Sequence, residues 1–94
     1  MKGYWIARVD VSDPEGYGEY AKIATQAVEE FGGRFLARGG KFLSKEGTNR
    51  QRNVIVEFPS LESANNCYNS ATYKRALAIA HKSAEREFII LEGA

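Results

Sequence analysis

Two arginines and two acids occupy positions from which they could hold a small organic acid. Arg8, Arg38 and Glu57 fall in three strand-like runs, each on the side expected to face away from the helices. Arginine presents a planar fork of donors that binds a carboxylate or enolate oxygen bidentately, and a nearby carboxylate can move a proton or orient the arginine. Asp10, on the same side as Arg8, offers a further acceptor at the rim. Arg8, Asp10, Arg38 and Glu57 are therefore the candidate ligand-binding residues.

The same charges also fit a purely structural role. Positive, negative and positive side chains on adjacent strands can form cross-strand ion pairs, and such a row could set the register of a dimer. If the hairpin between these strands centres near residues 47–48, Arg38 falls opposite Glu57, and a bulge at Gly39-Gly40 would shift this pairing by one residue. The sequence leaves the ligand-binding and the structural interpretations open.

Other reactive side chains are better explained by packing. Tyr17, Tyr20 and Tyr68 lie on inward-facing helical stripes, where aromatic residues more often belong to the core than to a catalytic site. His81 lies near a helix end, where the dipole favours a cation, although a general acid or base is the alternative. Cys67 has no histidine near it in the sequence and is expected to be a small buried residue.

The composition excludes several classes of protein. The 94 residues suffice for one domain, residues 1–94, and a formal charge of +1 lacks the basic excess of a nucleic-acid binder. No apolar run approaches the ~20 residues of a membrane span, and Arg8 and Asp10 interrupt any signal-peptide core. The single cysteine and the absence of zinc spacing, phosphate loops and dinucleotide fingerprints predict no metal and no bound coenzyme. We therefore expect a cytoplasmic protein without a cofactor.

The first elements that must position these side chains are a strand and a helix. Residues 3–11 alternate between apolar and mixed positions, as a strand with one buried face does. Asp13 is the expected cap of the following helix, with Pro14 at its first position. Gly32 is expected to end that helix, because the C-terminal cap needs a positive φ.

The middle of the chain predicts two further strands. One covers residues 34–38 and is expected to continue through 41–44 beyond a bulge or bend at Gly39-Gly40. A polar hairpin loop at 46–50 then leads to residues 54–58, the most strongly β-like run of the sequence.

The last part of the chain predicts a broken helix and a final strand. Ser60 is the expected cap, and a break is expected near Ser70, because the asparagines and serines before it are weak helix formers. The final strand is expected over residues 87–92.

This order, βαββαβ, predicts an α+β protein with the ferredoxin-like arrangement: one four-stranded antiparallel sheet with both helices on one face. The expected spatial order is fourth, first, third and second strand. The outward face would then carry Tyr4, Ile6, Arg8, Leu36, Arg38, Ile55 and Glu57. Such a face is too apolar to remain in water and too charged for a dry core, so we expect a homodimer whose sheets face each other around a partly polar lumen.

Six blocks of the sequence form a recognisable set: YWIARV at 4–9, DPEGY at 13–17, GGRFL at 32–36, RGG at 38–40, VEFPS at 56–60 and ILEG at 90–93. Together they resemble the domain-of-unknown-function family 1330. The resemblance spans nearly the whole chain and implies membership of the dimeric α/β-barrel group, in which two ferredoxin-like sheets form a barrel. That group also includes small monooxygenases, muconolactone-isomerase-like enzymes and haem proteins. The family has no settled reaction, so the resemblance implies a fold and a dimer, not a mechanism.

Two functions are compatible with these observations. The first is a small protein that binds or converts an organic acid or aromatic compound in a charged pocket on the sheet face. The second is a non-catalytic dimer, an interaction or stress-related module in which the charged row is structural. A cavity of ~300 Å3 or more, enclosed by the assembled dimer, would favour the first.

Overall fold

The computed structural model describes residues 1–94 and contains one antiparallel sheet of four strands in the order β2-β3-β1-β4. The elements are β1 (Gly3–Val11), α1 (Pro14–Glu30), β2 (Arg34–Arg38), β3 (Arg52–Phe58), α2 (Leu61–Tyr68), α3 (Ala71–Ser83) and β4 (Ala84–Glu92). The strand order and the alternation of strands and helices confirm the predicted ferredoxin-like fold.

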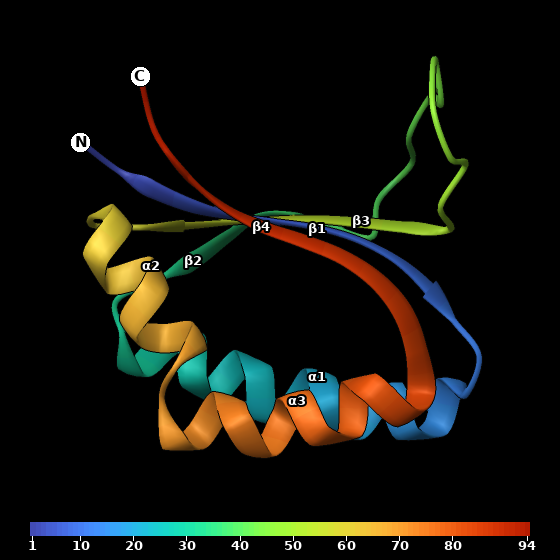
Figure 1. Cartoon of the computed structure of the whole chain (residues 1–94), viewed down its shortest axis with the longest axis horizontal. Coiled ribbons are helices and arrows are strands. Elements are labelled where there is room, and N and C mark those ends of the chain that lie inside the picture. The colour runs from blue at the N-terminus through green and yellow to red at the C-terminus, as the bar shows by residue number, and fades with distance from the viewer.

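All three helices lie on one side of the sheet, and the loop of residues 39–51 rises on the other side (Figure 1). We call these the helix face and the outer face. α1 packs mainly against α3 rather than directly on the strands, so long side chains fill the space between α1 and the sheet. No helix has the length and apolar character that crossing a membrane requires.

The helix ends follow the capping residues that the sequence predicts. The carboxylate of Asp13 accepts a hydrogen bond from the backbone N–H of Gly16 at 3.2 Å. At the other end of α1, Gly32 adopts a φ of 71°, and the N–H of Gly33 bonds back to the carbonyl of Val28. The predicted break is also present, because Ser70 ends the α2 region and caps α3 by accepting from the N–H of Tyr73.

The strand β2 differs from the prediction in two ways. It ends at Arg38, and residues 41–44 form no strand. The bulge lies between Phe35 and Ala37 instead of at Gly39-Gly40. Because a bulge adds one residue to the strand, Phe35 and Arg38 both face the helices, although an odd number of positions separates them.

This bulge overturns the predicted pairing of Arg38 with Glu57. Arg34 stands opposite Glu57, and Arg38 stands opposite Val54, a residue of the helix face. The prediction that Arg38 shares the outer face with Arg8 and Glu57 is therefore wrong.

Trp5 forms the centre of the core on the helix face. Its ring contacts those of Phe58, Tyr73 and Phe88, with centroids 4.8–5.2 Å apart. Its indole N–H donates to the carbonyl of Ala64 at 2.9 Å, so the one polar atom of the side chain is paired. Trp5 is therefore a core residue under the helices.

The cap at Gly32 can be tested by substitution. We expect Gly32→Val to lower the free energy of unfolding by roughly 1–2 kcal/mol, because a β-branched residue resists a positive φ. A matched control is Gly18→Ala in the middle of α1, where an added Cβ meets no atom within 4 Å. That change should raise the free energy of unfolding by about 0.5–1 kcal/mol. Urea denaturation measures both, and an unchanged Gly32→Val stability would contradict the assignment of the cap.

Candidate functional site

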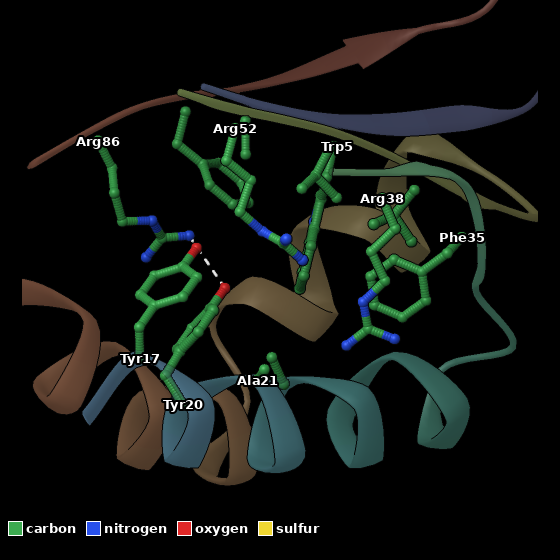
Figure 2. Close-up of a pocket in the computed structure, with 13 residues that line it drawn as sticks. Trp5, Tyr17, Tyr20, Ala21, Phe35, Arg38, Arg52 and Arg86 are labelled. Atoms are coloured by element: carbon green, nitrogen blue, oxygen red, sulfur yellow. Dashed lines mark hydrogen bonds between the residues drawn. The ribbon is translucent and has the colours of Figure 1, made fainter. Parts of the chain in front are cut away.

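A cavity lies between α1 and the helix face of the sheet. Figure 2 shows α1 below it and the strands above it. Most of its wall is apolar or aromatic, and its lining consists of Trp5, Ala7, Tyr17, Tyr20, Ala21, Ala24, Phe35, Arg38, Arg52, Val54, Val56, Arg86 and Phe88. The enclosed space is about 30 Å3, which suits a water molecule or two, and it reaches about 440 Å3 when the open mouth is included. A ligand would therefore displace side chains at the mouth.

Three arginines from three strands converge on this cavity: Arg38, Arg52 and Arg86. Arg52 and Arg86 flank Val9 in the sheet, since both stand opposite it on the neighbouring strands. The lining contains no Asp, Glu or His, and none of the three arginines takes part in an ion pair of the structure. The cavity thus collects positive charge without a protein counter-charge.

Arg86 is held by two tyrosine hydroxyl groups. Its Nη2 donates to the hydroxyl oxygen of Tyr20 at 3.0 Å and to that of Tyr73 at 2.9 Å. Figure 2 shows the bond to Tyr20. The guanidinium also lies 4.8 Å from the ring centroid of Tyr20, and its buried Nε has no hydrogen-bond partner. The buried Nε of Arg86 is therefore a free donor in a largely apolar site.

Arg38 and Arg52 occupy the mouth and the middle of the cavity. Arg38 is exposed, stacks over the ring of Phe35 at 3.8 Å and donates to Oγ1 of Thr25 on α1 at 2.6 Å. Arg52 has a buried Nε without a partner, and its guanidinium packs against Gly39, where a Cβ would lie only 2.2 Å from Nη1. Gly39 also has a φ of 69°, so a glycine fits this position both sterically and conformationally.

The tyrosines of the site are neutral hydrogen-bonding groups at neutral pH. Burial raises the pKa of Tyr17, and the three arginines act against that rise. Burial also raises the pKa of Tyr20 well above its ordinary value of 10.0, and it raises the pKa of Tyr73. The expectation that Tyr17 and Tyr20 pack in the core is confirmed, but both also line the cavity.

The other predicted site residues lie on the outer face, where protein groups already pair them. Arg8 forms an ion pair with Glu87 at 3.5 Å and bonds to Oδ1 of Asn53 at 3.2 Å. Asp10 accepts from Arg50 at 3.0 Å and from the backbone N–H of Gln51 at 2.9 Å.

Glu57 is separate from that group. It accepts from the hydroxyl of Tyr4 at 3.0 Å and from Nε of Arg34 at 3.2 Å. The four predicted residues therefore do not form one site.

Arg50, Arg52 and Arg86 are important residues that sequence reasoning missed. Arg50 is only 8% exposed and joins Asp10, Glu85 and Glu87 from its place in the long loop. The sequence does contain a signal for the other two. Arg52 is in phase with Val54, Val56 and Phe58, and Arg86 is in phase with Phe88 and Ile90, so extending each strand by a few residues would have placed both on the helix face.

His81 and Cys67 do not contribute to the cavity. His81 is exposed in the last turn of α3. Cys67 is buried, and burial raises the pKa of its thiol to about 12, which leaves it protonated and unreactive near neutral pH.

The family described as domain of unknown function (DUF1330) matches residues 2–94. The chain belongs to the DUF1330 family. This confirms the resemblance that its sequence blocks indicate. No curated protein matches the chain.

Solved structures show which folds this DUF1330 chain resembles. The methylated RPA0582 protein matches with a TM-score of 0.79 at 18% identity, over 99% of this chain and 81% of that one. RPA0582 is described as a protein of unknown function from Rhodopseudomonas palustris. SnoaB from Streptomyces nogalater, described as a cofactor-independent oxygenase, matches with a TM-score of 0.68 at 9% identity, over 99% and 93%. A Bacteroides fragilis protein described as dimeric, with a ferredoxin-like fold, matches with a TM-score of 0.56 at 14% identity, over 98% and 96%. At these identities the similarity shows the fold.

The raised tyrosine pKa values predict how stability responds to alkali. Because folding raises the pKa of Tyr17, Tyr20 and Tyr73, the folded chain holds more protons than the unfolded chain above pH 10. Their contribution to stability is complete below pH 10 and is lost as the pH rises through the raised values, and a tenfold difference in proton affinity corresponds to about 1.4 kcal/mol. Urea denaturation from pH 8 to 11 measures this loss, and absorbance titration should show tyrosines that ionise late. A single ionisation of all five tyrosines near pH 10 would contradict it.

Proposed function

We propose that this DUF1330 protein is a homodimer that binds a small organic acid, or an aromatic compound with an anionic oxygen, in the cavity on the helix face. One observation carries the proposal: Arg38, Arg52 and Arg86 converge on a cavity whose lining includes no acid. Removing cations from water is costly unless an anion or strong acceptors compensate. A ligand carboxylate or enolate would supply the missing negative charge and use the free donors of Arg52 and Arg86.

The walls of the cavity indicate the body of the ligand. Trp5, Tyr17, Tyr20, Phe35 and Phe88 surround the arginines with aromatic surface, which suits a flat apolar or aromatic group attached to the acid. The enclosed 30 Å3 must enlarge, and Arg38 is the side chain best placed to move, because it is exposed. The ligand is accordingly small.

The proposed site contains arginine and tyrosine as its polar groups. It has no thiolate, imidazole or carboxylate with which to hold a metal, so ligand binding is assigned to protein groups alone. SnoaB, which has the same fold, is described as a cofactor-independent oxygenase. An oxygenase acts on a substrate, so that description is compatible with a ligand site in this fold. The reaction itself is not part of the proposal.

The outer face supports the homodimer. Ile89 is 56% exposed and Leu91 is 51% exposed. The half-buried Ile6 stands between Ile89 and the half-buried Ile55 in the sheet. Exposed apolar groups on a sheet whose charges are already paired fit a second copy of the same face. The dimeric Bacteroides fragilis protein of this fold supports the same assembly. Arg8, Asp10 and Glu57 then have a structural role at or near the interface.

The dimer can be tested with a charge on that face, at Ile89 of the edge strand β4. We expect Ile89→Glu to convert a dimer into a monomer, because the interface would bury a carboxylate without a partner. Ala78→Glu, at an exposed position of α3, is the control and should remain dimeric. Light scattering at micromolar concentration gives the masses. A wild-type chain with the mass of a monomer would contradict the proposed assembly.

Ligand binding can be tested with benzoate, salicylate and phenylacetate as probes. We expect at least one of them to raise the melting temperature at millimolar concentration. Arg52→Met should weaken its binding by about 10- to 100-fold, the loss of a charged hydrogen bond. The variant should melt no lower than the wild type, because it also removes a buried donor without an acceptor.

Arg75→Met is the control for that experiment, since Arg75 is an exposed arginine of α3. It should leave probe binding unchanged. If no probe binds, or if Arg52→Met binds as well as the wild type, the anion site is not where we propose it.

A further inference from the structure

Tyr20, Tyr73 and Arg86 form a closed group of hydrogen bonds at the inner end of the cavity. The two hydroxyl oxygens are 2.8 Å apart, and Nη2 of Arg86 lies 3.0 Å from one and 2.9 Å from the other. Tyr20 is 7% exposed and lines the cavity, whereas Tyr73 is fully buried behind it. The three groups come from α1, α3 and β4.

One of the two hydroxyl protons in this group has no acceptor within it. Arginine only donates, and each tyrosine hydroxyl supplies one proton and two acceptor positions. One hydroxyl proton lies between the two oxygens. The other has no acceptor within the group, so it must point out of it.

Burial decides which proton that is. If Tyr20 donated to Tyr73, the proton of Tyr73 would be left in the core without an acceptor, because its hydroxyl bonds only to Tyr20 and Arg86. Unsatisfied buried donors are strongly disfavoured. In the other direction, Tyr73 donates to Tyr20, and the free proton belongs to Tyr20, which faces the cavity. The order of donation is therefore Tyr73 to Tyr20 to the cavity.

Arg86 prevents Tyr20 from accepting a hydrogen bond from the cavity side. The oxygen of Tyr20 accepts from both Tyr73 and Arg86, which uses both of its acceptor positions. Toward the cavity, Tyr20 can then only donate. Burial keeps its pKa high, so the hydroxyl proton is retained through neutral pH.

We propose that Tyr20 is a specificity-determining residue that donates its hydroxyl proton to an acceptor oxygen of the bound ligand, with Tyr73 and Arg86 as positioning residues. This rests on the proposed function and narrows its ligand class. Tyr20 and the three arginines all present donors, so the polar end of the ligand is acceptor-only: a carboxylate or an enolate. A primary amide of the same shape, which places N–H groups against these donors, is rejected.

The experiment compares benzoate with benzamide in wild-type protein and in three single variants that each remove one hydroxyl oxygen. Wild type should prefer benzoate. Tyr20→Phe should lose about tenfold in benzoate affinity and most of that preference. Tyr73→Phe should keep benzoate affinity within about twofold of wild type, because Arg86 still holds Tyr20, but it should lose part of the preference, because it frees an acceptor position on Tyr20 for the N–H groups of benzamide. Tyr68→Phe is the control, a half-buried tyrosine outside the cavity, and should change neither affinity. Equal losses in Tyr20→Phe and Tyr73→Phe overturn the proposal.

A measurement without ligand separates this proposal from the proposed function. Both variants remove one of the two acceptors of Arg86. Tyr20→Phe in addition deprives the buried Tyr73 proton of its acceptor. Tyr20→Phe should therefore melt about 4–8 °C below Tyr73→Phe. The opposite order, or no difference, shows that the protons do not run toward the cavity and overturns the inference. Failure of benzoate to bind wild type, with the predicted melting order intact, contradicts the proposed function alone.

Discussion

An arginine under a sheet needs acceptors, and this chain gives Arg86 two hydroxyl oxygens instead of a carboxylate. That choice constrains much of the helix face. Tyr20 must come from α1 and Tyr73 from α3, so both helices are tied to β4 through one guanidinium. The aromatic rings around Trp5 then fill the space that α1 leaves by packing on α3 rather than on the strands.

Arginines on the outer face of the sheet are paired with acids, whereas those on the helix face are not. On the outer face, Arg8, Arg34 and Arg50 each have an acid within 3.6 Å, and the acids come from the neighbouring strands. On the helix face, the arginines have phenols, a threonine hydroxyl and aromatic rings, but no acid. Paired charges can be covered by another surface, whereas unpaired charges keep affinity for an anion. We therefore propose that the outer face serves assembly and the helix face serves binding.

The fold could be predicted from the sequence because its signals are local. Asp13, Ser60 and Ser70 cap helices through hydrogen bonds that span three residues, and Gly32 ends α1 through its own φ. Alternation within each strand gives the face of nearly every apolar residue, and the family resemblance supports the same topology.

The site could not be predicted because it depends on where strands begin and where one of them gains a residue. Arg52 and Arg86 precede the strongly apolar parts of β3 and β4, so they resemble loop residues. The bulge at Leu36 turns the Arg38 side chain from the outer face to the helix face. The sequence does not indicate a bulge at this position, because Leu36 is neither glycine nor proline. The alternation along a strand predicts only which side chains share a face of the sheet. One inserted residue moves every later side chain of that strand to the opposite face.

The exposed position of Arg38 has a consequence for kinetics. A cluster of positive charge at the mouth of an apolar cavity attracts anions before they touch the protein and speeds their association. Since charges separated by more than about 8 Å are largely screened at physiological ionic strength, added salt should slow capture of an anion more than it hastens its escape.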